Sequence, residues 1–212
     1  MENIETEIYP KLREYIENLN VNFSIISESR KSQLEQIAEY LSELISNGKD
    51  INIIFICTHN SRRSHIAQLW AWAASYYFSI PNVNTFSGGT EATAFNHRSV
   101  KAMTKAGFEI IEIEGGGNPV FECSLSESGE KIKSFSKEFS HSSNPQSDFI
   151  AVMVCSDADE ACPFVPGAAK RFSLPYDDPK KFENTDLEEI KYDAATMLIA
   201  TEIFYMFSKI KI

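Results

Sequence analysis

The sequence predicts an α/β fold: an open, mainly parallel four-stranded sheet with helices on both faces. Apolar runs of strand length alternate along the chain with stretches in which apolar residues recur at spacings of three and four. Residues 51–56 are mostly β-branched, which is typical of a strand buried on both faces, and residues 64–76 show the helical spacing. Strands that alternate with helices in this way pair in parallel through right-handed crossovers.

Residues 1–50 are predicted to form an N-terminal helical extension, and residues 51–212 the α/β domain. Two helical stripes carry this prediction, and Pro10 is tolerable only near the start of the first helix. Gly48 follows the second helix as a C′ residue. The stripes consist of Ile8, Leu12, Ile16 and Leu19, and of Leu34, Ile37, Leu41, Leu44 and Ile45.

The middle of the chain is expected to hold two more strands of the parallel sheet, at residues 82–87 and 108–113. Between them we expect a helix that Asn96 caps and Gly107 ends. An insertion should follow at residues 114–147. Its apolar stretches, residues 120–125 and 131–135, are candidates for a hairpin, and its remainder is a polar loop.

The last part of the chain should return to the sheet with a buried strand at residues 149–154, and residues 170–174 could form a last strand. Thr185 and Glu188 form a capping-box pattern ahead of a long final helix. In open parallel sheets ligands bind beyond the carboxyl ends of the strands. Cys57, Cys155 and the loop at residues 175–179 all follow strands, so we expect them to meet at one edge.

Composition places the chain among ordinary globular proteins, with 43% hydrophobic and 24% charged residues in 212. A net charge of -10 argues against a nucleic-acid or anionic-membrane surface. No apolar run approaches the roughly 20 residues that span a bilayer, and the first residues lack a signal-peptide pattern. We therefore expect a cytoplasmic protein whose four cysteines are reduced at rest, which favours catalytic or redox roles.

The stretch with the clearest chemistry runs from Cys57 to Ser64, called here the Cys57 loop. A loop between a strand and a helix start aims unpaired backbone N–H groups at one point, where the helix dipole also favours an anion. Arg63 can add a two-pronged contact to an oxyanion, and the same field favours a Cys57 thiolate nucleophile. Ser64 could donate to that thiolate or cap the helix. A buried core thiol is the usual outcome for a cysteine alone, but the combined pattern favours the oxyanion site.

Cys155 and Cys162 form a second candidate cluster. Their separation is too long for a C-x2-C metal pair, and no histidine lies nearby, so neither a metal nor another cofactor is expected. If the segment between them is helical, the two sulfurs stand roughly 10 Å apart, beyond disulfide reach. A disulfide between them would require that helix to loosen.

Several segments resemble known proteins. CTHNSRRS at residues 57–64 resembles the phosphate-binding loop of low-molecular-weight protein tyrosine phosphatases. VCSDADEACP at 154–163 is similar to the redox segment of thioredoxin-coupled arsenate reductases built on the same fold. The segment at 86–110 is similar to the family's segment after the first helix, and YDDP at 176–179 to its general-acid loop. The segments follow the family's order, whereas residues 1–50 and much of 114–147 lie outside the resemblance.

The resemblance implies a mechanism for arsenate reduction. Cys57 attacks arsenate held by the amides of Thr58, His59, Asn60, Ser61, Arg62, Arg63 and Ser64 and by the Arg63 side chain, while Asp178 protonates the departing oxygen. Cys155 then attacks the Cys57 adduct, and Cys162 captures Cys155 in a disulfide that thioredoxin reduces. The choice of Asp178 over Asp177 depends only on its place beside Pro179.

Some positions depart from the family. His59 stands where the family usually has glycine, and we interpret it as a solvent-facing loop residue. Arg62 replaces a frequent cysteine and should add positive charge at the mouth of the site. Lys180 and Lys181 take the place of the tyrosine pair of the phosphatases, which counts against phosphotyrosine as substrate.

Three functions remain open at this point. The first is a thioredoxin-linked arsenate reductase, which needs Cys57, Cys155 and Cys162. The second is a phosphomonoesterase of the low-molecular-weight phosphatase type, which needs only Cys57, Arg63 and Asp178. The third is a non-catalytic oxyanion or redox sensor whose N-terminal helices contact a partner. The paired cysteines favour the first.

Overall fold

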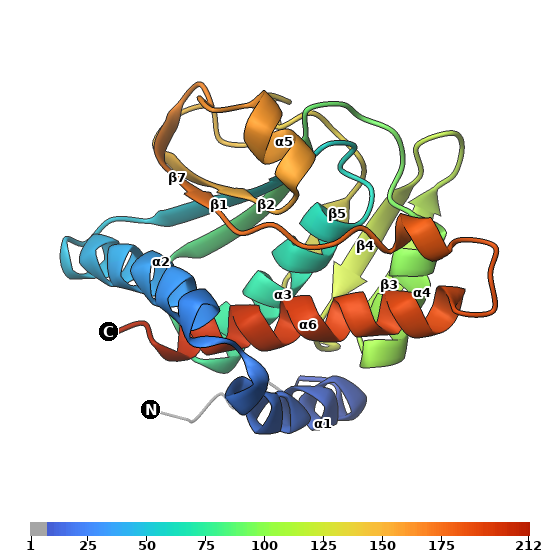
Figure 1. The fold of residues 1–212 in the computed structure, drawn as a ribbon, viewed down its shortest axis with the longest axis horizontal. Helices are drawn as coiled ribbons and strands as arrows, with labels where there is room; N and C mark the ends of the chain where they lie inside the picture. The colour runs from blue at the N-terminus through green and yellow to red at the C-terminus, as the bar shows by residue number, and fades with distance from the viewer. Residues whose placement is uncertain (1–7) are drawn as a thin grey trace.

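A four-stranded parallel sheet forms the centre of the protein (Figure 1). The structure is a computed structural model and describes residues 8–212. The strands follow the order β2-β1-β6-β7. They are β1 (Ile51–Cys57), β2 (Val83–Gly89), β6 (Phe149–Met153) and β7 (Ala168–Ser173). β1 and β6 are central and almost entirely buried, as their continuous apolar sequences predict. The predicted fold class is confirmed.

Two long helices complete the main core. α3 (Arg63–Tyr77) packs against β1 and β2, and α6 (Glu188–Ser208) packs against α3. α3 is buried on nearly all sides because α6 covers the face turned away from the sheet. The predicted capping box of α6 is wrong. Its N-cap is Leu187, and the Glu188 carboxylate accepts from the backbone N–H of Asn184 instead of that of Thr185.

The strand predicted at residues 108–113 does not join the parallel sheet. It is β3 (Glu109–Glu114), and it forms a separate antiparallel sheet with β4 (Val120–Ser124) and β5 (Lys131–Ser134), in the order β3-β4-β5. β3 alternates glutamate with isoleucine and is largely exposed, a pattern that suits a half-covered antiparallel sheet. The predicted β4–β5 hairpin is confirmed. The helix before β3 is α4 (His97–Ala106), capped by Asn96 and ended by Gly107 at φ 112°, as predicted.

The N-terminal segment packs on α6 through α1 (Pro10–Leu19), a 3-10 helix η1 (Asn20–Ile25) and α2 (Glu28–Ser46). The predicted apolar stripe of α1 is buried, and α1 begins at Pro10. Gly107 is required where α1 meets α4, because a Cβ there would lie 2.4 Å from the backbone nitrogen of Leu12. The domain boundary at residue 50 stays a prediction.

Two short helices lie on either side of β7 in the sequence. α5 (Ser156–Ala161) joins β6 to β7, and a 3-10 helix η2 (Pro179–Phe182) begins at the end of the loop at residues 175–179. In Figure 1 the chain between β7 and η2 crosses the molecule between α5 and α6. Within residues 8–212, no helix is long and apolar enough to cross a membrane.

Candidate active site

Cys57 ends β1 with its side chain against the first turn of α3. It is only 3% exposed, and its Sγ lies 3.1 Å from the hydroxyl oxygen of Ser64. Both residues are fixed by the elements that carry them, a central strand and a fully buried helix start. The hydroxyl is therefore within reach to donate to a Cys57 thiolate.

The Cys57 loop turns its carbonyl groups away from the site. The Thr58 carbonyl accepts from the backbone N–H of Glu91, and the His59 carbonyl accepts from the hydroxyls of Thr93 and Ser136. In the described part of the chain, no acceptor pairs with the backbone N–H groups of residues 58–64. Unpaired N–H groups in a turn before a helix form a binding site for an oxyanion.

Asn60 holds the shape of this loop. It is fully buried, has a positive φ of 42°, and its side-chain amide donates to the Ser64 hydroxyl at 2.8 Å. Its amide oxygen accepts from the backbone N–H of Lys137, 2.8 Å away. Asparagine tolerates the left-handed conformation better than most residues, so one side chain serves both the turn and its anchorage. Ser61 is held by a bond to the carbonyl of Ala94.

Arg63 reaches from the helix start to the loop at residues 175–179, called here the acid loop. Its guanidinium donates to the carbonyl oxygen of Tyr176 at 2.9 Å and to Asp178 Oδ2 at 2.8 Å. Its Nε is buried without a hydrogen-bond partner among the described residues. A buried charged donor without a partner is costly, and an oxyanion in the loop would satisfy it.

The two aspartates of the acid loop have different surroundings. Asp178 binds Arg63 and accepts from the backbone N–H of Lys180, whereas the Asp177 side chain is 93% exposed and, among residues 8–212, pairs only with Lys181. Asp178 is therefore the carboxylate that faces the Cys57 loop. In the sequence, only the neighbouring Pro179 distinguishes Asp178 from Asp177 as the candidate acid.

Arg62 does not offer a free charge at the mouth of the site. Its guanidinium donates to Glu183 Oε1 at 2.8 Å and to the hydroxyl of Tyr192 at 2.9 Å, and it is buried. Burial disfavours the charge, but the hydrogen bonds to Tyr192 and Glu183 outweigh it and raise the pKa of Arg62. The expected extra positive charge is present but matched by Glu183. His59 is partly exposed, as interpreted, and its ring lies 3.8 Å from the Glu91 carboxylate.

Cys155 adjoins the Cys57 loop. It ends the segment after β6, is fully buried, and its sulfur lies 3.5 Å from the hydroxyl oxygen of Thr58, the neighbour of Cys57. Cys162 lies at the other end of α5 and is partly exposed. Arg171 holds this helix to β7 by donating to the carbonyls of Cys162 and Asp159. All four cysteines are free thiols, and burial raises the pKa of Cys123 to about 12.

Two buried basic residues behind the loop were missed by sequence reasoning. His65 is fully buried, stacks on Phe95 at 4.1 Å, and has its pKa lowered well below the usual value, first by burial and then by the charge of Lys137. Lys137 is 5% exposed, and burial lowers its pKa to about 8. No sequence signal marks Lys137, since it begins a polar loop, and His65 sits in a helix that is buried all round.

Comparison with solved structures shows which class of fold carries this site. A low-molecular-weight protein tyrosine phosphatase from T. tengcongensis aligns over 76% of this chain and all of its own, with a TM-score of 0.54 and 14% identity. The YwlE mutant structure from Bacillus subtilis gives a TM-score of 0.52 and 16% identity over 75% of this chain and 97% of its own. The fold is that of the low-molecular-weight phosphatases.

Curated relatives narrow the class. The arsenate reductase of Bacillus licheniformis is 32% identical over 137 residues, which cover 65% of this chain and 80% of that protein. The arsenate reductase of Brevibacillus brevis is 30% identical over 139 residues, covering 66% and 84%. No family model matches the chain. The chain belongs to the arsenate reductase family built on the low-molecular-weight phosphatase fold. It is therefore an enzyme, an arsenate reductase or a related cysteine-dependent phosphatase.

Proposed function

We propose that this protein reduces arsenate to arsenite through a relay of Cys57, Cys155 and Cys162 that thioredoxin resets. The observation that supports the proposal most is the 3.5 Å contact between the Cys155 sulfur and Thr58, because it brings a second thiol beside the loop of the first. The relatives named arsenate reductases point the same way.

The first step is attack by the Cys57 thiolate on arsenate bound in the loop. The unpaired N–H groups and the Arg63 guanidinium stabilise the charge on the bound oxygens. As arsenic gains a bond to sulfur it loses one to oxygen, and Asp178 supplies the proton that lets that oxygen leave as water. The Arg63–Asp178 ion pair is 2.8 Å long, so before the attack Arg63 exchanges this contact for the oxyanion, and Asp178 takes up from solvent the proton that it then donates.

The second step transfers two electrons to arsenic. The Cys155 thiolate attacks the Cys57 sulfur, a Cys57–Cys155 disulfide forms, the sulfur–arsenic bond breaks with its electron pair on arsenic, and arsenite leaves. Cys162 then attacks Cys155 and releases Cys57 as a thiolate. The final Cys155–Cys162 disulfide is reduced by thioredoxin, whose own dithiol is oxidised.

The third thiol requires movement of α5. Cys155 and Cys162 flank a helix of six residues, so closing their disulfide requires that helix to unwind. Unwinding breaks the contacts of Arg171 with Asp159 and with the Cys162 carbonyl. α5 has only six residues, and besides β1 and β6 it is held by side chains of β7, so few contacts have to be broken and the cost of unwinding is low. The relay needs a reducing partner, so we propose that it operates in the cytoplasm.

A coupled assay tests the relay. Arsenate-dependent NADPH consumption is measured with thioredoxin and its reductase for wild type, Cys57→Ser, Cys155→Ser and Cys162→Ser, with Cys123→Ser as the matched control. We expect the three relay variants to lose turnover and Cys123→Ser to keep it. Wild-type turnover by Cys162→Ser would refute the relay. Phosphomonoester hydrolysis that survives Cys155→Ser and Cys162→Ser, without arsenate reduction by wild type, would select the phosphatase instead.

A further inference from the structure

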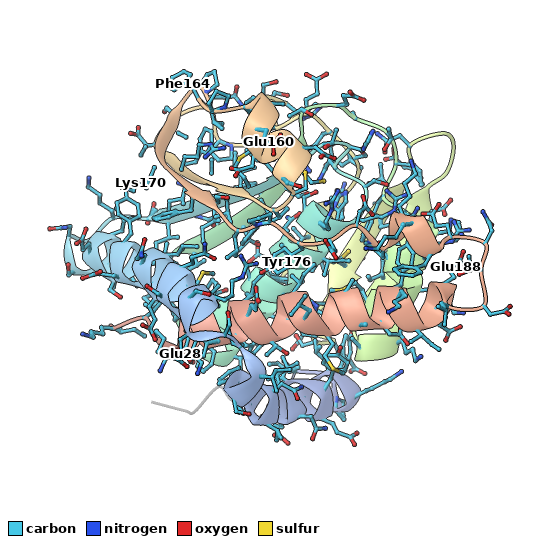
Figure 2. All side chains as sticks on the ribbon, in the orientation of Figure 1. Glu28, Glu160, Phe164, Lys170, Tyr176 and Glu188 are labelled. Atoms are coloured by element: carbon cyan, nitrogen blue, oxygen red, sulfur yellow. The ribbon has the colours of Figure 1, made fainter. Side chains whose placement is uncertain are left out.

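The acid loop is held from its outer side by a residue of the N-terminal segment. Arg30 lies in the first turn of α2 and donates from one guanidinium nitrogen to the carbonyl oxygen of Pro175, 3.1 Å away. Its guanidinium carbon lies 4.9 Å from the ring centroid of Tyr176. Figure 2 labels Tyr176 next to α6 and Glu28 at the first residue of α2, two positions before Arg30 in the sequence. Two consecutive residues of the acid loop, Pro175 and Tyr176, therefore contact the same arginine, which lies outside the segments that resemble the family.

This arginine is itself fixed. Its Nε donates to Glu202 on α6 at 2.8 Å, and the side chains are only 16% and 7% exposed. A planar guanidinium can bind a carboxylate, donate to a carbonyl and stack on a ring at the same time, whereas a lysine ammonium cannot. Tyr176 is buried, and burial raises its pKa well above the usual value, so its ring stays a neutral face for the guanidinium.

The inner side of the same loop carries the proposed acid. The carbonyl of Tyr176 accepts from Arg63, and the other prong of Arg63 binds Asp178. Tyr176 is thus held by Arg30 through its ring and by Arg63 through its carbonyl. Without the outer contacts, the acid loop would no longer hold Asp178 at a fixed distance from the Cys57 loop. General acid catalysis depends steeply on that distance.

We propose that Arg30 is a positioning residue that holds the acid loop so that Asp178 can protonate the leaving oxygen. The inference rests on the proposed function, in which Asp178 is the general acid. It assigns the N-terminal segment a part in the reaction, since α2 brings to the site a contact that residues 51–212 do not supply.

The test compares leaving groups. In wild type, Arg30→Met and the control Lys31→Met, kcat and KM are measured for arsenate reduction and for hydrolysis of phenyl phosphate and p-nitrophenyl phosphate. Phenol needs protonation to leave, whereas nitrophenolate needs little. We expect Arg30→Met to lower kcat for arsenate and phenyl phosphate about tenfold or more, with a smaller effect on p-nitrophenyl phosphate and little change in KM. Lys31 pairs with Glu28, whose side chain is 89% exposed, and contacts no part of the acid loop, so Lys31→Met should match wild type.

A second variant separates positioning from stability. Arg30→Met leaves Glu202 buried without its partner, so Arg30→Met/Glu202→Gln should regain stability without regaining kcat for phenyl phosphate. Recovery of kcat together with the melting temperature would overturn the proposal, as would an equal loss for both leaving groups. An active wild type with an unaffected Arg30→Met refutes only the positioning role. A wild type that turns over neither arsenate nor phosphomonoesters refutes the proposed function and this inference together.

Discussion

The buried Lys137 should cost the protein stability at neutral pH. Burial lowers its pKa from 10.5 to about 8, and no carboxylate among the described residues offsets that effect. At about 1.4 kcal/mol per pKa unit, the difference amounts to about 3 kcal/mol. Methionine has a similar shape and no charge, so Lys137→Met should raise the free energy of unfolding by up to that amount at about pH 7. The backbone bond from residue 137 to Asn60 is unaffected by the substitution.

The pH dependence distinguishes this cause from simple packing. The pKa of Lys137 is lower in the folded chain than in the unfolded chain, so folding releases a proton between pH 8 and 10.5. The penalty is fully present below pH 8 and disappears as the pH rises to 10.5. Urea unfolding under reducing conditions should therefore give a gain for Lys137→Met that shrinks to about 1 kcal/mol at about pH 9.5. Lys133→Met, an exposed site on β5, is the control. A gain that is the same at both pH values, or a loss at pH 7, would refute the reasoning.

Three further predictions concern the site itself. Asp178→Asn should lower kcat for arsenate reduction by about 10² to 10³, while Asp177→Asn, altered at an exposed carboxylate, should stay near wild type in the same steady-state assay. Gly89→Ala should lower the melting temperature and abolish turnover, because its Cβ would lie 2.3 to 2.6 Å from backbone atoms of the adjoining loops; a variant with wild-type activity would contradict this. Arg171→Leu should speed formation of the disulfide between Cys155 and Cys162, the two cysteines that α5 separates, as measured by thiol trapping after addition of an oxidant. An unchanged rate would show that Arg171 does not restrain the helix.

The centre of the parallel sheet was predictable because β1 and β6 are continuous apolar runs, and the helix ends because Asn96, Gly107 and Gly48 have local signals. The order of the elements along the chain predicts β3 in this sheet, but its composition contradicts that place. Its repeated glutamates rule out a strand buried on both faces, and this pattern was already present in the sequence.

The Cys57 loop could be predicted because its signals are local: the strand, the loop and the helix start lie within a few residues of one another. The contacts that complete the site join distant parts of the chain. Glu183 neutralises Arg62, Lys137 anchors Asn60, and Arg30 holds Tyr176. Such pairs depend on how the elements pack, so no spacing or periodicity could reveal them.

A single-turnover experiment tests the relay most directly. Reduced wild-type protein is mixed with arsenate in the absence of any other reductant, the thiols are trapped with an alkylating agent, and the peptides and arsenite are quantified. The relay predicts one arsenite per chain, a Cys155–Cys162 disulfide, and alkylated Cys57 and Cys123. Arsenite release after which all four cysteines are found alkylated, or a stable final disulfide that includes Cys57, would contradict the three-thiol relay.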